Sequence, residues 1–188
     1  MKKIVFLVIA CFWLSIPGLA ISGSSPGDWT GNLNLFLGAK ALDEYEWEPA
    51  DEQDEYGVEV DFKQVGWPVS IAIDFLSGSG EGTYWGDKFE SKTSELNVGV
   101  RKIWDTFPRV RPFIGGGISF ITGEFSGLGL SDDDSAAGIW IGGGVYWTLG
   151  KNFNIGLEGK YSTADVALFG VDADAGGGHF GILVGFHW

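Results

Sequence analysis

The sequence has one cysteine, one methionine and only two histidines among its 188 residues. The cysteine, Cys11, lies in an apolar N-terminal stretch that we expect to be removed, so the mature chain would have no disulfide and no thiolate chemistry. This absence suits a chain that crosses an oxidising periplasm in the unfolded state, where stray thiols would form unwanted disulfides.

Basic residues and long apolar runs are also scarce. Without Lys2 and Lys3, 10 basic residues remain against 25 acidic ones, a net charge of −15, which argues against nucleic acid and anionic surfaces as partners. No apolar run after residue 20 reaches the roughly 20 residues of a membrane-spanning helix. Glycine (31 residues) and aromatic residues (15%) are abundant instead. This composition is typical of membrane β-barrels, in which lipid-facing and lumen-facing residues alternate.

The N-terminus predicts a secretory signal peptide over residues 1–20. Two lysines precede the apolar run Ile4 to Leu14, and Gly18 and Ala20 offer small residues for cleavage. A membrane anchor is the alternative, but the apolar run is short for a span. Lipoprotein processing at Cys11 is a second alternative, although this residue lies inside the apolar core. Residues 21–28, rich in Ser, Gly and Pro, predict a flexible leader, and one domain over residues 29–188 follows.

The C-terminal segment alternates strictly between two kinds of residue. Every second position is apolar or aromatic: Phe180, Ile182, Val184, Phe186 and Trp188. A period of two indicates a strand with one apolar face, which in an outer-membrane barrel is covered by lipid. The same pattern predicts seven further strands, over residues 29–40, 56–65, 69–76, 93–104, 111–122, 137–148 and 153–162.

The predicted connections alternate between long and short. We expect long loops over residues 43–55, 77–92, 123–136 and 163–176, with short turns between the other strand pairs. Eight strands of about ten residues, with short periplasmic turns and long external loops, predict an all-β fold: an eight-stranded antiparallel up-and-down transmembrane β-barrel. A soluble barrel of the lipocalin type is the alternative, but it would carry its apolar face inward.

Aromatic residues gather at the predicted strand ends. Tryptophans lie at the short-turn end: Trp29, Trp67, Trp104, Trp147 and Trp188. Tyr56, Phe75 and Tyr161 lie at the other end. Membrane barrels carry such aromatic girdles at both interfaces.

Three segments resemble a known family. The terminal strand from Phe180 to Trp188 looks like the signal read by the barrel-assembly machinery, and Arg111 to Gly117 and Gly143 to Gly150 look like the fifth and sixth strands of small OmpA/OmpX-type barrels. The resemblance covers the whole mature chain and implies a barrel of this architecture. It leaves function open, because such barrels include anchors, adhesins, small pores and lipid enzymes. With no second domain recognisable in the sequence, we do not expect cell-wall anchoring.

The strand pattern predicts a charged lumen. The residues expected inside are Lys40, Glu59, Asp61, Lys63, Asp74, Glu95, Arg101, Glu158 and Lys160. The interior of such a barrel is about wide enough for its own side chains, and buried charges must be paired. We therefore expect an ion-pair network that plugs the barrel, with a gated proton or ion path as the alternative.

The sequence gives weaker support for a metal site, a catalytic triad or a cation-binding loop. His179 and His187 share the lumen face but are about 26 Å apart at roughly 3.3 Å per residue, too far for one metal. Either could join a catalytic triad with Ser162 and Glu158, but no spacing requires this. The acidic loops could bind divalent cations, yet solvated loops are the simpler interpretation.

We thus predict a non-enzymatic outer-membrane protein that stabilises the envelope and displays acidic loops. It would have no cofactor and no metal. Its expected partners are outer-membrane lipid, lipopolysaccharide, periplasmic chaperones and the barrel-assembly machinery. The alternatives are a narrow channel for small solutes or ions and a lipid A-modifying enzyme.

Overall fold

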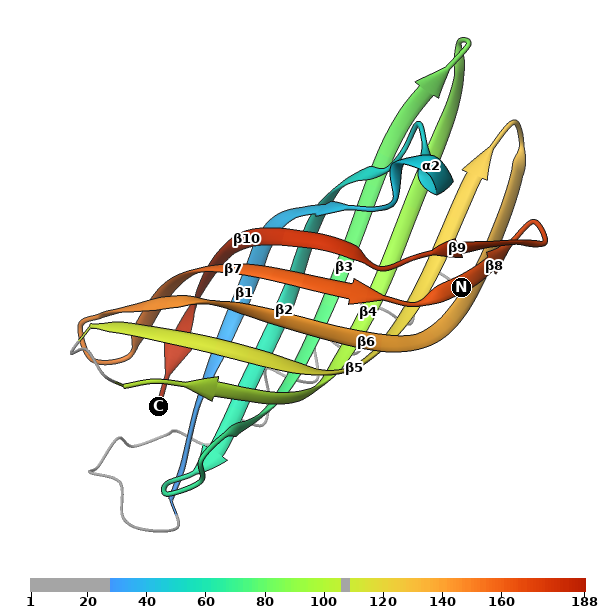
Figure 1. Ribbon diagram of the computed structural model, residues 1–188. Helices are drawn as coiled ribbons and strands as arrows, with labels where there is room; N and C mark the ends of the chain where they lie inside the picture. Colours follow the sequence, from blue (N-terminus) through green and yellow to red (C-terminus); the bar gives the residue numbers. More distant parts are fainter. Residues whose placement is uncertain (1–27, 106–108) are drawn as a thin grey trace, which may run out of the picture.

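The computed structural model describes residues 28–105 and 109–188. The expected signal peptide (1–20) and all of the expected leader (21–28) except Asp28 lie outside the described residues, so both stay predictions. Eight antiparallel strands close into a barrel in the order β1-β10-β7-β6-β5-β4-β3-β2 (Figure 1). They are β1 (Trp29–Ala41), β2 (Glu52–Gln64), β3 (Ser70–Tyr84), β4 (Asp87–Ile103), β5 (Val110–Gly127), β6 (Leu130–Leu149), β7 (Phe153–Thr163) and β10 (Gly177–His187).

Pairing of the first and last strands closes the barrel. β1 and β10 are antiparallel over ten residue pairs, from Asn32↔His187 to Ala41↔Gly178. The backbone of Trp188 extends this contact, because its N–H donates to Gly31 O and its carbonyl accepts from Gly31 N, both at 3.1 Å. The predicted fold is thereby confirmed, and no sheet edge is left open in the barrel wall.

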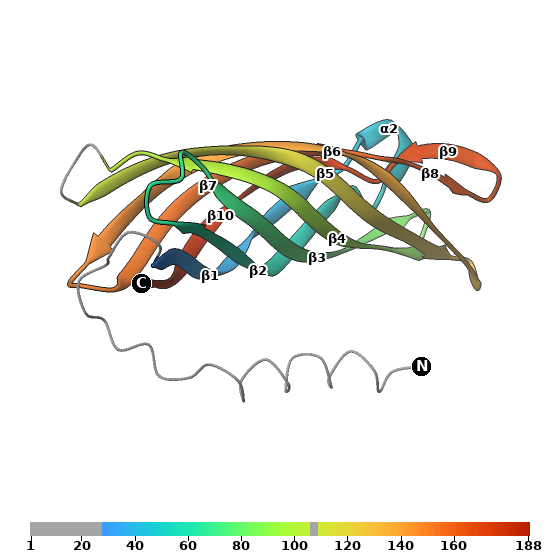
Figure 2. The same ribbon diagram turned by 90° about the horizontal axis from the view of Figure 1, so that it is seen from below.

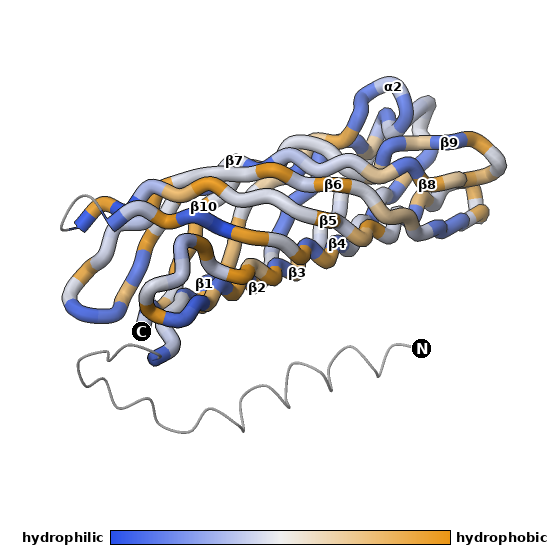
Figure 3. The backbone as a smooth tube through the Cα atoms, turned by 60° about the horizontal axis from the view of Figure 1, so that its bottom comes forward, coloured by the Kyte–Doolittle hydropathy of each residue, from blue (hydrophilic) through white to orange (hydrophobic). Residues whose placement is uncertain are grey.

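Side chains alternate between the lumen and the outer surface along each strand. In β7, for example, Asn154, Gly156, Glu158 and Lys160 are buried, whereas Ile155, Leu157 and Tyr161 are exposed. The exposed positions of the other strands are likewise apolar over the middle of the barrel, and Figure 3 shows the resulting alternation of hydropathy along the chain. No helix in the described part of the chain is long and apolar enough to cross a membrane.

The prediction of four long loops was wrong, because most residues of these segments lie in strands or in a helix. Residues 77–92 form the outer halves of β3 and β4, which pair up to Tyr84↔Asp87, and residues 123–136 form those of β5 and β6, which pair up to Gly127↔Leu130. These segments are rich in Gly, Ser and charged residues and lack the row of alternating apolar side chains that marks the rest of each strand. The apolar alternation that guided the prediction therefore stops before the strands end, whereas the hydrogen-bonded ladder continues.

The other two predicted loops also contain regular structure. Residues 43–55 include a short helix, α2 (Glu44–Trp47), and the first residues of β2. Residues 163–176 include a hairpin of β8 (Asp165–Leu168) and β9 (Val171–Asp174). Figure 2 shows α2, β8 and β9 gathered at the end of the barrel opposite the C-terminus.

Candidate functional site in the barrel lumen

Arg101 of β4 lies at the centre of a buried ion-pair network. Its Nη2 is 3.1 Å from Glu59 Oε2 and 3.1 Å from Asp74 Oδ2, and its Nη1 is 3.5 Å from Asp61 Oδ2. Nη1 also donates to the Tyr146 hydroxyl at 3.4 Å. These partners lie on β2, β3 and β6, so one guanidinium connects the barrel wall across the lumen.

Lys160 of β7 occupies the second cationic position. Its Nζ is 2.8 Å from Asp74 Oδ2, 3.0 Å from Glu59 Oε1 and 3.4 Å from Glu158 Oε1. Atoms of these three carboxylates lie within 4.8 Å of one another, close enough to hold a metal ion. The ammonium group lies within ion-pair distance of all three, so the chain supplies its own cation at this position.

The network carries more acids than bases. Four buried carboxylates (Glu59, Asp61, Asp74 and Glu158) face two buried cations, and neither carboxylate oxygen of Glu158 has a hydrogen-bond partner among the described residues. Buried charge is tolerated only when it is paired. Arg101 and Lys160 are therefore each required to compensate more than one carboxylate.

A second polar layer lies toward the external end of the lumen. Lys40 Nζ is 3.2 Å from Glu95 Oε2, and it donates to Thr93 Oγ1 at 3.4 Å and to the carbonyl oxygen of Ala175 at 2.8 Å. Because Ala175 follows the β8–β9 hairpin, Lys40 fastens this hairpin to the lumen. The position of Lys40 is as the strand pattern predicted.

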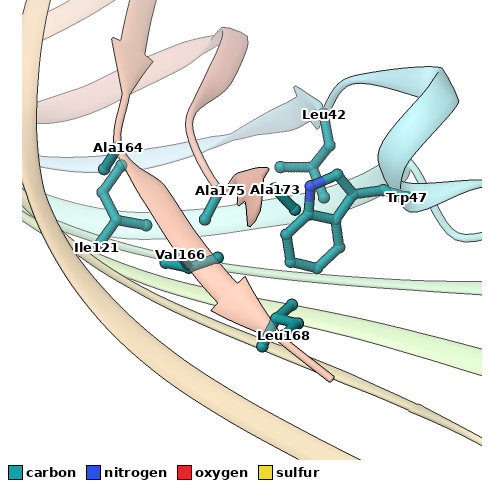
Figure 4. Packing of buried hydrophobic residues seen from close by; sticks show 8 residues of the cluster. All are labelled: Leu42, Trp47, Ile121, Ala164, Val166, Leu168, Ala173 and Ala175. Carbon is teal, nitrogen blue, oxygen red and sulfur yellow. The ribbon is translucent and has the colours of Figure 1, made fainter. Parts of the chain in front are cut away.

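An apolar cap adjoins this polar layer through Ala175, whose carbonyl oxygen Lys40 binds. Figure 4 shows the residues of the cap. The cap consists of Leu42, Trp47, Ile121, Ala164, Val166, Leu168, Ala173 and Ala175, all buried. Trp47 of α2 is 1% exposed, and its Nε1 donates to the carbonyl oxygen of Asp174 at 2.8 Å. The segment that follows β1 and the segment that precedes β10 thus fold over the barrel mouth and pack against each other. Sequence reasoning missed the cap.

His179 lies directly below the cap in a three-residue constellation. Its Nε2 is 3.0 Å from Ser162 Oγ, and its Nδ1 is 2.8 Å from Glu55 Oε2. This order of serine, histidine and acid is that of a hydrolase triad. The sequence pattern did not require a contact between Ser162 and His179, but the structure brings them together. The acid on Nδ1 is Glu55 and not Glu158, because β2 begins at Glu52 and carries Glu55 into the lumen.

The same serine is placed poorly for catalysis. Ser162 has no exposed surface, and its Oγ also donates to Glu95 Oε2 at 3.1 Å. A nucleophile must reach the substrate carbonyl, and here the cap lies between Ser162 and the external solvent. In the structure these groups act as a hydrogen-bonded layer of the lumen.

Two predicted lumen residues lie apart from the networks. Lys63 is half-buried near the short-turn end of β2 and takes part in none of the ion pairs between described residues, so its assignment to the charge network was wrong. His187 lies at the same end, half-buried, and its Nδ1 has no hydrogen-bond partner in the described part of the chain. The remaining predicted lumen charges are buried.

The predicted interface aromatics lie on the outer surface. Trp29, Trp67 and Trp104 are exposed, Trp147 is half-buried, and the rings of Trp29 and Trp67 pack edge to face at 5.7 Å. On β10, Phe180, Ile182 and Phe186 face outward as the alternation required. Val184 is half-buried in the same row.

The acidic segment of β6 is partly engaged in structure. Asp134 Oδ2 accepts the backbone N–H of Ala167 at 2.8 Å, and Asp132 Oδ2 accepts that of Phe169 at 2.6 Å. The backbone hydrogen bonds lower the pKa of Asp134, which lies outside the lipid. These carboxylates hold the β8–β9 hairpin against β6, which differs from the predicted solvated loop.

No family model and no curated protein matches the sequence. Solved structures do match. The attachment invasion locus protein Ail of Yersinia pestis aligns with a TM-score of 0.58 and 14% identity, covering 86% of this chain and 99% of Ail. Neisserial surface protein A aligns with a TM-score of 0.58 and 12% identity, covering 88% and 97%. The N-terminal barrel domain of Pseudomonas aeruginosa OprF aligns with a TM-score of 0.51 and 15% identity, covering 84% and 97%. The chain therefore has the fold of the small eight-stranded outer-membrane β-barrels.

Proposed function

We propose that the chain is a non-conducting, non-enzymatic protein of the outer membrane that stabilises the envelope and holds an acidic platform above the lipid. The observation that supports this most strongly is the closed lumen. Ion pairs around Arg101 and Lys160 fill its middle, and the cap around Trp47 covers its mouth. A path for solutes would require both to be displaced.

The external part of the chain has the properties of a platform. The outer halves of β3, β4, β5 and β6 continue the barrel wall as paired strands, so they are held more rigidly than loops. The four segments 43–55, 77–92, 123–136 and 163–176 together carry eighteen acidic and two basic residues. Outer-membrane lipid and lipopolysaccharide are the proposed surroundings of this part.

The charge of the platform separates it from one structural neighbour. One structure of Ail is a complex with the heparin analogue sucrose octasulfate. A polyanion of this kind would be repelled by the acidic excess of these segments. We therefore do not propose a sulfated polysaccharide as the partner of this chain.

Planar-bilayer conductance of the refolded chain 21–188 tests the closed lumen. We expect no discrete openings, because several buried ion pairs would have to separate for an ion to pass. A heat-dependent shift in gel mobility measured beforehand shows that the barrel has formed. Steady openings from the folded protein would contradict the proposal and favour the channel alternative.

We also propose that the terminal strand guides assembly by periplasmic chaperones and the barrel-assembly machinery. Replacement of Phe186 by Ser should lower the amount of folded protein in the outer membrane several-fold, because it interrupts the apolar row of β10. The matched control is Phe120→Ser, which removes an equally lipid-facing ring from β5. Equal losses in both variants would assign the effect to lipid contact and contradict a signal specific to β10.

A further inference from the structure

Apart from Tyr45 of α2, the highly exposed large apolar side chains in the external part of the barrel are concentrated at the turns of three hairpins. Trp85 lies between β3 and β4 and is 89% exposed, Leu128 lies between β5 and β6 and is 69% exposed, and Phe169 lies between β8 and β9 and is 52% exposed. Tyr84, Leu130 and Val171 beside them are exposed as well. Figure 1 shows these turns on separate hairpins at the same end of the molecule.

The three turns share an unfavourable backbone conformation. Trp85, Leu128 and Phe169 have φ values of 55°, 53° and 52°, and each is followed by a glycine with positive φ. Positive φ at both central residues defines the type I′ hairpin turn, for which Asn-Gly is the preferred sequence. A bulky apolar residue is costly there. The chain therefore keeps an apolar residue at each tip although a polar one would fit the turn better.

The rest of the protruding sheet is unavailable for binding through its edges. Along β3, a Cβ added at Gly82 would collide with the carbonyl oxygen of Pro49. The connection between β1 and β2, which contains Pro49, therefore covers this edge. Along β6, the carboxylates of Asp132 and Asp134 accept backbone N–H groups of the β8–β9 hairpin, from its turn and from β8 respectively. Protected edges of this kind prevent strand addition by another chain.

The inner face of the protruding sheet is also occupied. The ring of Phe125 stacks on Phe89 at 5.9 Å and meets Trp47 edge to face at 6.0 Å, which joins the sheet to the cap. The outer face carries polar and charged residues such as Lys88, Glu90 and Asp133. The tips are thus the part of the sheet that can contribute apolar contact.

Charge indicates which apolar environment the tips can enter. The eighteen acidic residues of the external segments disfavour anionic surfaces and favour groups that present a cation outermost. At the tip of the β3–β4 hairpin, the rings of Tyr84 and Trp85 meet edge to face at 6.2 Å, with Asp87 two residues beyond Trp85. Aromatic rings beside a carboxylate attract quaternary ammonium groups such as choline.

We propose that Trp85, Leu128 and Phe169 insert into the surface of an apposed phosphatidylcholine bilayer. Trp, Leu and Phe are the residues with which proteins enter the headgroup region of a bilayer. Three separate apolar tips match a planar surface better than a protein partner, whose energetic hot spots cluster at the centre of one contiguous interface. This inference goes beyond the proposed function, because it holds whether or not the lumen conducts.

The turn type supplies a test that preserves the fold. In the triple variant Trp85→Asn, Leu128→Asn and Phe169→Asn, each tip becomes the preferred Asn-Gly turn. The hairpins should therefore form at least as well, while the apolar tips are lost. The control variant Thr83→Asn, Ser126→Asn and Ser131→Asn adds three asparagines to two of the same hairpins and leaves every tip unchanged.

Flotation with vesicles measures the proposed contact. The full barrel, embedded in nanodiscs, is mixed with vesicles of phosphatidylcholine or of phosphatidylglycerol and separated on a density gradient. We expect binding to phosphatidylcholine at least tenfold above that to phosphatidylglycerol. We also expect at least a tenfold loss in the tip variant and no loss in the control. Free phosphocholine should compete only weakly, because it offers no apolar phase.

Three results would overturn the proposal. In the first, the unmodified protein does not bind phosphatidylcholine vesicles. In the second, the tip variant binds them as well as the unmodified protein does. In the third, free phosphocholine competes fully with the vesicles. The first would leave a protein partner as the occupant of the tips, and the third would replace the bilayer by a soluble headgroup. Gel mobility before and after heating confirms in each case that the barrel of the tested variant is folded.

Discussion

Replacement of Arg101 by Met should lower the free energy of unfolding by about 3–5 kcal/mol, the loss typical of breaking a buried ion pair. The guanidinium lies within 3.7 Å of oxygens from Glu59, Asp61, Asp74 and Glu158. Without it, Lys160 is the cation left beside four buried carboxylates. Urea-induced unfolding of the refolded barrel in lipid vesicles measures the effect.

The pH dependence of this loss distinguishes charge from packing. At neutral pH the uncompensated carboxylates repel one another in the variant, whereas acidic pH protonates them and removes the repulsion. The loss should therefore shrink as the pH is lowered. A loss independent of pH would show that the missing volume of the arginine, and not its charge, is responsible.

Lys102→Met is the matched control for Arg101→Met. Lys102 is the next residue on β4, but its side chain points away from the lumen and its Nζ donates to the carbonyl oxygen of Pro68 at 2.7 Å. Loss of an exposed charged contact typically changes stability by less than about 1 kcal/mol. Equal destabilisation of both variants would contradict the central role of the lumen network.

The barrel could be predicted because alternation is a local property of the sequence. A side chain's parity along a strand decides whether it faces lipid or lumen, and Glu158 and Lys160 were placed correctly on this basis alone. An odd or even position in the strand does not indicate how far along the barrel axis the side chain lies. Lys63 has the right parity, but it lies near the rim, where water can solvate its charge.

The strand ends could not be predicted from the same pattern. Apolar alternation marks the part of a strand that lies in lipid, and the paired strands β3 to β6 extend well beyond it. Glu55 was missed for this reason, since it was assigned to a loop. Gln53, Glu55, Gly57 and Glu59 share one parity, and this would have been the signal that β2 begins earlier.

The cap depends on contacts that have no periodic signature. Trp47 reaches Asp174, 127 residues away, and Asp174 N donates in turn to Glu46 Oε2 at 2.6 Å. Such docking of two segments that lie far apart in the sequence is decided by their shape and by the burial of their side chains. From the sequence, Trp47 is predicted to lie in a solvated acidic loop. Nothing in the pattern indicates that its side chain is buried.

Replacement of Trp47 by Ala should open the cap, and a cysteine at position 162 can report the opening. Truncation of a fully buried tryptophan costs about 3–5 kcal/mol. Every 1.4 kcal/mol changes an equilibrium tenfold, so the open fraction of the cap should rise about a hundredfold or more. Because Cys11 is the only native cysteine, a refolded chain 21–188 with Ser162→Cys carries a single thiol.

The rate of maleimide labelling of this thiol then measures access to the lumen from outside. Ser162 has no exposed surface, so the Ser162→Cys barrel should label slowly, and addition of Trp47→Ala should raise the rate by the same hundredfold factor. The matched control adds Tyr45→Ala, because Tyr45 lies on the same helix but is 96% exposed. Fast labelling without any change at Trp47 would mean that the mouth is already open. Ser162, His179 and Glu55 would then be accessible to a substrate. That result would favour the alternative in which the protein is a lipid-modifying enzyme.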